Sequence, residues 1–208
     1  MTESHLTPEK WDLYNAQGKI VRTMIRGKER VPEGLYHLTV EVVVTDGKGY
    51  MLITQRSLEK KRGGGKWEFP AGSVLSGETP AAAAKRELFE ETGITVEKVK
   101  RISQTRTAGL IRLAYLAVIP NLKEQEIVLA PDETQDYNFV TFSQWIRLAV
   151  ENMLESRRLQ MYDTTFFAAL EKAVGLPEHE PTNNFTPNKQ TMAPSVPGPL
   201  KPNRKDRL

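Results

Sequence analysis

Apolar and polar positions alternate along short stretches in the first part of the chain. Residues 11–24 form two short extended runs about an Ala-Gln-Gly turn, and residues 38–56 place apolar runs on both sides of Asp46-Gly47. Alternation with a period of two residues is typical of strands, and an Asp-Gly pair between apolar runs favours a hairpin. The pattern therefore predicts two strand pairs before residue 57.

Residues 79–92 predict a helix with well-defined ends. Thr79 stands where an N-cap is expected, Pro80 occupies the first helical position, and a run of alanines follows. Gly93 comes directly after the last helical residue, where a left-handed C-cap conformation favours glycine.

The remaining pattern predicts further strands and then two helices. Strands followed by a helix, more strands and two closing helices indicate an α/β fold with helices on both faces of a mixed sheet. No internal repeat is present. The predicted strands are 94–105, 111–120, 126–130 and 136–142, and the predicted helices are 143–156 and 164–175.

The chain of 208 residues is long enough for one sizeable domain with a core. From residue 177 onward, Pro, Asn, Thr and Ser dominate and few groups are suited to a core. We therefore expect an N-terminal hairpin extension at 1–34, a main domain at 35–176 and a flexible C-terminal tail at 177–208.

Composition limits the location and the partners. No apolar run approaches the roughly twenty residues that span a bilayer, and no secretory signal opens the chain, so we expect no membrane partner. The absence of cysteine excludes disulfides and thiolate metal sites and favours a cytoplasmic location. The net charge is +3 and the pI is near 9.0, but the basic residues are scattered, so nucleic acid is an unlikely partner.

Three carboxylates gather on one side of the predicted helix. Residues three and four apart share a helix face, so Glu87, Glu90 and Glu91 project in similar directions and repel one another. Such a face is stable either when it is open to water or when cations lie among the carboxylates. The spacing alone leaves both readings open.

The wider spacing around this helix resembles the signature of the Nudix hydrolases. Gly72 is followed by five residues and Glu78, then by seven residues and the segment RELFEETGI, residues 86–94. Every specified position of the Nudix box is filled. The resemblance covers roughly residues 35–145 and implies a Nudix-type α/β/α sandwich with a mixed central sheet.

The resemblance also implies a metal site. Glu90 and Glu91 would be metal ligands together with the backbone carbonyl of Gly72 or Ala71. Glu87 would be a further ligand or the catalytic base, and Arg86 would orient a carboxylate. Oxygen donors without cysteine or clustered histidine suit Mg²⁺ or Mn²⁺. Such cations neutralise a diphosphate and activate a bound water molecule.

Candidate residues outside the box are fewer. By resemblance, Glu133 matches a further metal-binding or catalytic glutamate placed just before a strand. The segment KKRGGGKW offers Lys60, Lys61, Arg62 and a glycine run suited to gripping phosphates, although such loops are also ordinary hairpin connections. Arg56, at a strand end, is a second candidate for phosphate binding.

The box specifies the reaction better than the substrate. We expect Mg²⁺-dependent cleavage of a diphosphate linkage in a nucleoside diphosphate derivative or a related small phosphorylated metabolite. The start of the chain, through His37, resembles the subgroup of isopentenyl-diphosphate isomerases, but the cysteine that such isomerases need is missing. An isomerase-like protein acting on isoprenoid diphosphates and a non-catalytic nucleotide-binding module remain alternatives. The family resemblance is compatible with a homodimer.

The aromatic side chains of Trp67 and Phe69 are expected to pack in the hydrophobic core.

Overall fold

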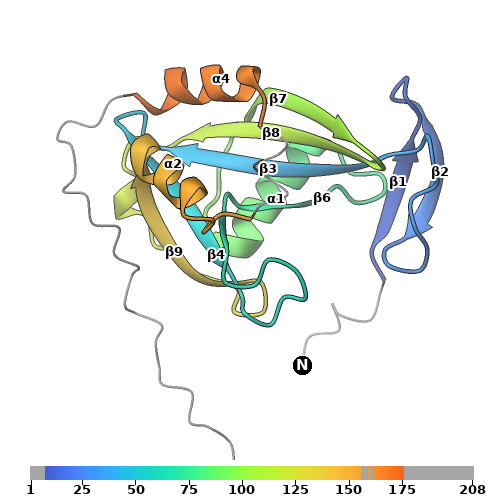
Figure 1. Cartoon of the computed structure of the whole chain (residues 1–208), viewed down its shortest axis with the longest axis horizontal. Helices are drawn as coiled ribbons and strands as arrows, with labels where there is room; N and C mark the ends of the chain where they lie inside the picture. The colour runs from blue at the N-terminus through green and yellow to red at the C-terminus, as the bar shows by residue number, and fades with distance from the viewer. Residues whose placement is uncertain (1–7, 156–158, 160–161, 176–208) are drawn as a thin grey trace, which may run out of the picture.

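The computed structural model describes residues 8–155, 159 and 162–175. The predicted tail at 177–208 lies outside this range, and the predicted boundary between residues 34 and 35 stays a prediction. A seven-stranded sheet forms the centre (Figure 1). Its strands are β3 (His37–Thr45), β4 (Tyr50–Arg56), β5 (Trp67–Glu68), β6 (Ala71–Ser73), β7 (Lys100–Thr107), β8 (Leu110–Val118) and β9 (Thr134–Thr141).

The central sheet is mixed, as the sequence predicts. β3 and β8 run parallel over their whole length, from His37 opposite Leu110 to Thr45 opposite Val118, and the other pairs are antiparallel. β3 pairs with β4 only at Val44 and Thr45, and nearer its start it pairs with β6. β6 therefore lies beside the first half of β3, where the segment leading into the helix begins.

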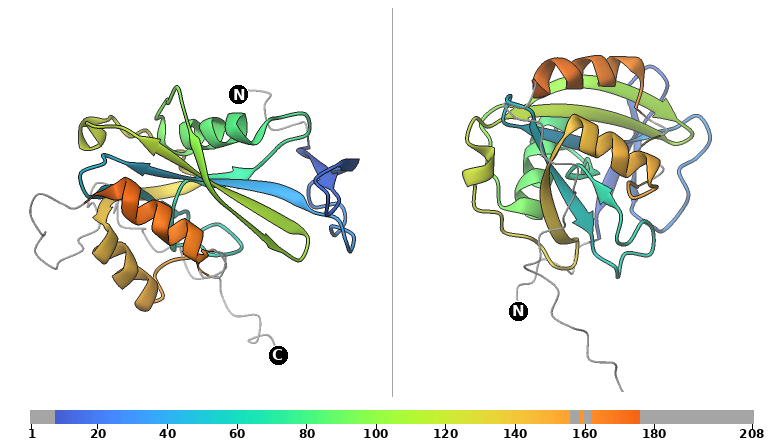
Figure 2. Two further views of the ribbon diagram at one scale, coloured as in Figure 1. Left: turned by 90° about the horizontal axis from the view of Figure 1, so that it is seen from above. Right: turned by 60° about the vertical axis from the view of Figure 1, so that its left-hand side comes forward.

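Helices cover both faces of the sheet, so the predicted α/β/α layering is confirmed. α1 (Pro80–Thr92) lies on one face, and α2 (Phe142–Val150) and α4 (Thr164–Val174) lie on the other (Figure 2). Along β3, Val42 packs in the core beneath α1 and Val43 packs in the core beneath α2 and α4. Alternate side chains of one strand thus build two hydrophobic cores.

The ends of α1 follow local sequence chemistry. The Thr79 hydroxyl accepts a hydrogen bond from the Ala82 backbone N–H at 3.2 Å. Gly93 adopts φ of 73°, a left-handed conformation that favours glycine, and its N–H donates to the Phe89 carbonyl at 2.7 Å. Both predicted caps are therefore confirmed.

The predicted N-terminal hairpin is also present. It consists of β1 (Lys10–Tyr14) and β2 (Ile20–Ile25) and lies at one end of the central sheet (Figure 1). The Asp12 carboxylate accepts hydrogen bonds from the Ser76 hydroxyl at 2.7 Å and from the Gly77 N–H at 2.9 Å. These bonds join β1 to the segment that leads into α1.

Three predicted elements differ from the structure. Residues 126–130 form no strand, because Val128 donates its N–H to the Thr92 carbonyl at the end of α1 and Ile127 packs against the core beneath α1. Residues 94–99 are also not a strand, so β7 begins at Lys100.

The helix predicted at 143–156 is shorter than expected. α2 ends at Val150, and Asn152 turns the chain with φ of 55°. The following segment then pairs with β5, because Trp67 donates its N–H to the Met153 carbonyl at 2.9 Å and accepts from the Glu155 N–H at 3.0 Å. None of the helices in the described part of the chain is long and apolar enough to cross a bilayer.

Candidate active site

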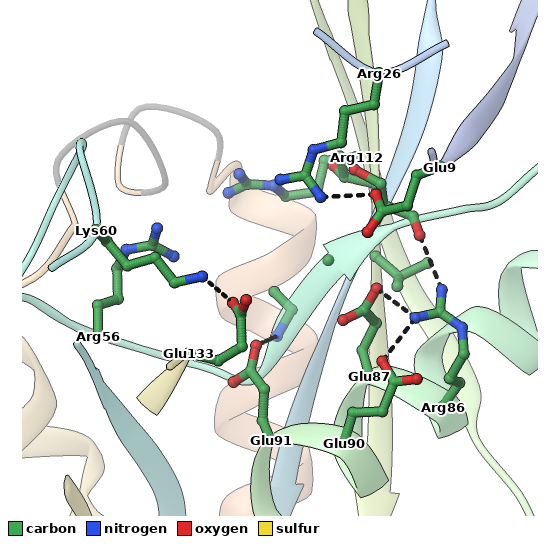
Figure 3. Close-up of a pocket in the computed structure, with 15 residues that line it drawn as sticks. Glu9, Arg26, Arg56, Lys60, Arg86, Glu87, Glu90, Glu91, Arg112 and Glu133 are labelled. Carbon is green, nitrogen blue, oxygen red and sulfur yellow. Dashed lines mark hydrogen bonds and ion pairs between the residues drawn. The ribbon is translucent and has the colours of Figure 1, made fainter. Parts of the chain in front are cut away.

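A polar pocket of about 410 Å³ opens where β6 leads into α1 (Figure 3). The glutamates of α1 form one part of its wall, and basic residues from the end of the β1–β2 hairpin, from β4 and the loop after it, and from β8 form another. The acidic residues at the pocket are Glu9, Glu87, Glu90, Glu91 and Glu133, and the basic ones are Arg26, Arg56, Lys60, Arg86 and Arg112.

Arg86 lies at the centre of the acidic cluster. Its guanidinium donates to Glu87 at 2.8 Å and to Glu90 at 3.0 Å, and it binds both carboxylate oxygens of Glu78 at 2.9 Å. A fourth acceptor is the Ser73 carbonyl, at 3.0 Å. Burial lowers the pKa of Arg86, but the Glu78 and Glu87 carboxylates more than offset this and raise it above its ordinary value. One fixed positive charge therefore orients three carboxylates.

Glu87 lies directly against the backbone of Gly72. A Cβ placed on Gly72 would be 2.0 Å from the Glu87 carboxyl carbon, so only glycine leaves this carboxylate its present position. Burial raises the pKa of Glu87, and the Arg86 charge opposes this without cancelling it, while the Glu90 charge adds to the increase. The Glu87 carboxylate consequently accepts a proton more readily than an exposed one.

Glu91 has a different environment from its neighbour Glu90. Its side chain is buried, and its two oxygens accept hydrogen bonds from the Ala71 N–H at 3.3 Å and from the Thr54 hydroxyl at 3.4 Å. Glu90 is about half exposed, with 54% of its side chain accessible. Glu91 therefore sits at the base of the pocket and Glu90 at its opening.

Glu133 reaches the same pocket from the segment before β9, where it forms an ion pair with Lys60 (Figure 3). Arg56, at the end of β4, donates to Glu68 at 2.7 Å and also lines the pocket. The structure thus brings the predicted residues Glu133 and Arg56 to the box glutamates, although they lie far from them in sequence.

Two candidates from the predicted phosphate-binding loop do not line the pocket. Lys61 and Arg62 are exposed and are not among the residues that line this pocket, whereas Lys60 is. The glycine loop uses backbone groups internally: Gly65 donates its N–H to the Arg56 carbonyl and Lys66 donates to the Gly63 carbonyl. This arrangement is typical of a hairpin connection. Glu78, the first glutamate of the box, is bound by Arg86 and also lies outside the pocket lining.

Trp67 and Phe69 are buried in the core beneath α2 and α4, as expected. His37 stacks on Trp11 with ring centroids 4.2 Å apart, and its Nδ1 lies 3.1 Å from the Gly109 carbonyl. Burial lowers the pKa of His37, so its ring is neutral at neutral pH. His37 is not among the pocket-lining residues.

Three charged pocket residues were not anticipated from the sequence: Glu9, Arg26 and Arg112. Arg112 lies on β8, and its guanidinium is 3.7 Å from the carboxylate of the buried Glu41 on β3. A charged residue within the otherwise apolar run 110–118 is the only signal that the sequence offered for it. Glu9 and Arg26 carry no such signal, because their position depends on how the hairpin docks.

The donor set fits a hard divalent cation. Glu87, Glu90 and Glu91 supply carboxylate oxygens to one pocket, and the missing Cβ of Gly72 leaves room for Glu87 against the backbone. Among the described residues, no three His, Cys, Asp or Glu side chains are arranged closely enough to hold an ion in their present positions. The oxygens of Glu87 and Glu90 are engaged by Arg86 instead.

The fold and the pocket define an α/β/α sandwich with an acidic helix facing a basic wall, which is a class of site suited to phosphorylated ligands. The family model for the NUDIX domain matches residues 35–163. The chain therefore belongs to the Nudix hydrolase family.

Three curated relatives illustrate the range of the family. An uncharacterized Nudix hydrolase of Listeria innocua, lin0387, is 34% identical over 140 residues, covering 64% of this chain and 80% of the relative. An isopentenyl-diphosphate Delta-isomerase of Streptomyces coelicolor is 27% identical over 159 residues (67% and 81%). An RNA pyrophosphohydrolase of Roseobacter denitrificans is 31% identical over 134 residues (58% and 81%).

Solved structures support the fold. The crystal structure of DR0079 from Deinococcus radiodurans superposes with a TM-score of 0.61 at 18% identity, covering 74% of this chain and 100% of the other. At this identity the likeness concerns the α/β/α architecture alone.

Proposed function

We propose that this protein is a Mg²⁺- or Mn²⁺-dependent hydrolase that cleaves a diphosphate linkage in a nucleoside diphosphate derivative or a related phosphorylated metabolite. One observation carries the proposal: Gly72, Glu87, Glu90 and Glu91 of the box line the same pocket as the cations Arg56 and Lys60. A diphosphate binds where positive charge offsets its own negative charge, and this pocket offers basic side chains together with oxygen donors for a metal.

Glu90, Glu91 and Glu87 would hold the metal, with the Gly72 backbone beside them. When bound, the cation neutralises phosphate oxygens and acidifies a coordinated water molecule. Arg86 keeps Glu87 and Glu90 oriented, and Arg56 and Lys60 bind phosphate oxygens at the other wall.

Two carboxylates are candidates for the base that takes a proton from water. Burial raises the pKa of Glu87, which makes it a stronger base than an exposed carboxylate. Glu133 lies at the same pocket, where it forms an ion pair with Lys60. Comparing Glu87→Gln with Glu133→Gln in the pH dependence of kcat distinguishes the two roles.

The isomerase alternative is supported by the Streptomyces coelicolor relative and opposed by residues of this chain. The sequence contains no cysteine, and His37 is engaged with Trp11 and Gly109 rather than with the pocket. The binding-module alternative is opposed by the complete set of box glutamates, because binding alone does not need a full metal site.

A substrate screen tests the three functions together. The protein is incubated with nucleotide sugars, dinucleotides, coenzyme A, nucleoside triphosphates and prenyl diphosphates in Mg²⁺ or Mn²⁺, and both products are identified. We expect two phosphorylated products, or phosphate release, that a chelator abolishes. A rearranged prenyl diphosphate would favour the isomerase, and tight binding without turnover would favour the binding module.

A further inference from the structure

The N-terminal hairpin contributes two charged residues to the pocket. Glu9 and Arg26 line it together with the glutamates of α1, and Figure 3 shows Arg26 reaching the pocket from the hairpin on the side away from Glu90 and Glu91. Neither residue belongs to the Nudix box or to the segment that the family model matches. Their presence raises the question of what a basic side chain does at this end of the pocket.

Arg26 is held in place by its surroundings. Its guanidinium carbon lies 5.7 Å from the centre of the Trp11 ring, and Trp11 in turn stacks on His37 of β3. The Arg26 backbone N–H donates to the Glu9 carbonyl at 2.9 Å. The hairpin and the stacked rings of Trp11 and His37 therefore orient the Arg26 side chain relative to the central sheet.

The hairpin itself is fixed relative to α1. Asp12 binds Ser76 and Gly77, and the Ser76 N–H donates to the Lys10 carbonyl at 2.8 Å. Because these contacts attach β1 to the segment that leads into α1, the position of Arg26 relative to the α1 glutamates is determined by the fold.

The partner of Arg26 is one that an anion can replace. Arg26 pairs with Glu9 at 2.7 Å, and both side chains are about half exposed (57% and 45%). Exposed ion pairs contribute little to stability because water screens them. A phosphate group carries more charge than a carboxylate and presents several acceptors to the guanidinium fork, so it competes well for Arg26.

The other arginines at the pocket are more deeply engaged. Arg56 donates to the buried Glu68, and Arg112 lies beside the buried Glu41. Arg26 is therefore the arginine at this pocket whose ion pair can be exchanged with the least disturbance of buried charge.

We propose that Arg26 is a substrate-binding residue: its guanidinium exchanges Glu9 for the substrate phosphate that lies farther from α1. The hairpin is then part of the substrate site, and the substrate presents phosphate groups to both walls of the pocket. This inference rests on the proposed function in taking a diphosphate as the ligand.

A binding measurement tests the proposal with a matched control. The probe is methylenediphosphonate, a diphosphate analogue that is not hydrolysed, titrated by calorimetry in Mg²⁺. Arg26→Gln should weaken binding about tenfold, since a hydrogen bond to a charged group is lost. Arg22→Gln is the control, because Arg22 lies in the same hairpin and forms a similar exposed pair with Glu29 at 2.9 Å, but is absent from the pocket lining.

A second variant should change the affinity for the probe in the opposite direction. Glu9→Gln removes the competing carboxylate and should tighten binding of methylenediphosphonate about twofold to fivefold. Equal affinities in Arg26→Gln and Arg22→Gln, or a wild-type protein that does not bind the probe, would overturn the proposal. Thermal unfolding of both arginine variants verifies that each keeps the fold, since Arg26→Gln also loses the contact of its guanidinium with the Trp11 ring.

Steady-state kinetics separate this inference from the proposed function. With a substrate found in the screen, Arg26→Gln should raise KM about tenfold and leave kcat within about twofold. If no compound is hydrolysed but the effect of Arg26→Gln on probe binding persists, the proposed function fails and the phosphate site stands. If hydrolysis proceeds with an unchanged KM in Arg26→Gln, the phosphate site fails and the proposed function stands.

Discussion

Arg86 determines how the acidic residues of the site are arranged at the level of single side chains. Neighbouring carboxylates on one helix face repel each other by a few tenths of a kcal/mol per pair, and Arg86 offsets this by binding Glu87 and Glu90. Glu91 is instead stabilised by the Ala71 N–H and the Thr54 hydroxyl. The three box glutamates thus have distinct surroundings, which allows their roles to be separated by mutation.

Glu90→Gln and Glu91→Gln should each reduce turnover at least about a hundredfold, because each removes a carboxylate at the proposed metal site while keeping the side-chain volume. The measurement is kcat in Mg²⁺, with thermal unfolding to verify the fold. Glu97→Gln is the control, since Glu97 is an exposed glutamate just beyond α1 and outside the pocket lining. Near-normal turnover in both site variants would contradict the assignment.

Gly72→Ala tests the close approach of Glu87 to the backbone. The added Cβ would be 2.0 Å from the Glu87 carboxyl carbon, so this carboxylate must move away. Because the end of a flexible side chain can move, we expect the melting temperature to change little and activity to fall at least about tenfold. A variant that keeps full activity would show that the present Glu87 position is not needed.

At the scale of elements, the β1–β2 hairpin depends on Asp12 for its attachment to the α1 segment. Burial raises the pKa of Asp12, but hydrogen bonds from Ser76, Gly77 and Thr23 outweigh it and hold the pKa below its ordinary value of 3.8. A carboxylate with a depressed pKa in the folded state stabilises the fold above its unfolded-state pKa, and this stabilisation is lost as the pH falls through the folded-state pKa.

Asp12→Asn should therefore lower the free energy of unfolding by about 1–3 kcal/mol at neutral pH, because charge-assisted hydrogen bonds are lost. The difference from the wild type should stay constant above pH 3.8 and shrink as the pH falls below that value. Urea denaturation at several pH values measures it. A difference that grows toward acid pH would show that the charge of Asp12 does not stabilise the fold.

Elements set by local chemistry were predicted accurately, and elements set by distant contacts were not. The ends of α1 follow from Thr79 and Gly93, which act on the nearest turn. Residues 126–130 have the apolar content of a strand, yet Val128 bonds to the Thr92 carbonyl and the segment covers the end of α1 instead. Only the packing of the whole chain decides which apolar run finds a partner strand.

At the scale of the whole molecule, the pocket joins segments from much of the described chain. Glu9 and Arg26 come from the hairpin, Glu133 from the segment before β9, and the box glutamates from α1. α4 contributes by packing on the far face of the sheet, where the Gly49 N–H donates to the Val174 carbonyl at 2.7 Å. Among the residues that the structure describes, the candidate site and the elements that support it thus extend from the hairpin to α4.

Deleting the residues after Gly175 should leave kcat/KM within about twofold of the full chain, since the tail composition is unsuited to a core and α4 is retained. The measurement compares both chains on one substrate, together with their masses in solution. A loss of activity or of a dimer in the shortened chain would assign a function to the tail.

The sequence by itself determined the box, the caps of α1 and the alternation that produces a mixed sheet with two cores, because these depend on spacing along a few consecutive residues. It also indicated Glu133 and Arg56 as candidates. Tertiary structure decided that Lys60 rather than Lys61 or Arg62 faces the pocket, and that Arg26 and Glu9 reach it at all. A side chain's direction in a loop and the docking of a hairpin are set by contacts between distant residues, such as Asp12 with Ser76, which periodicity does not encode.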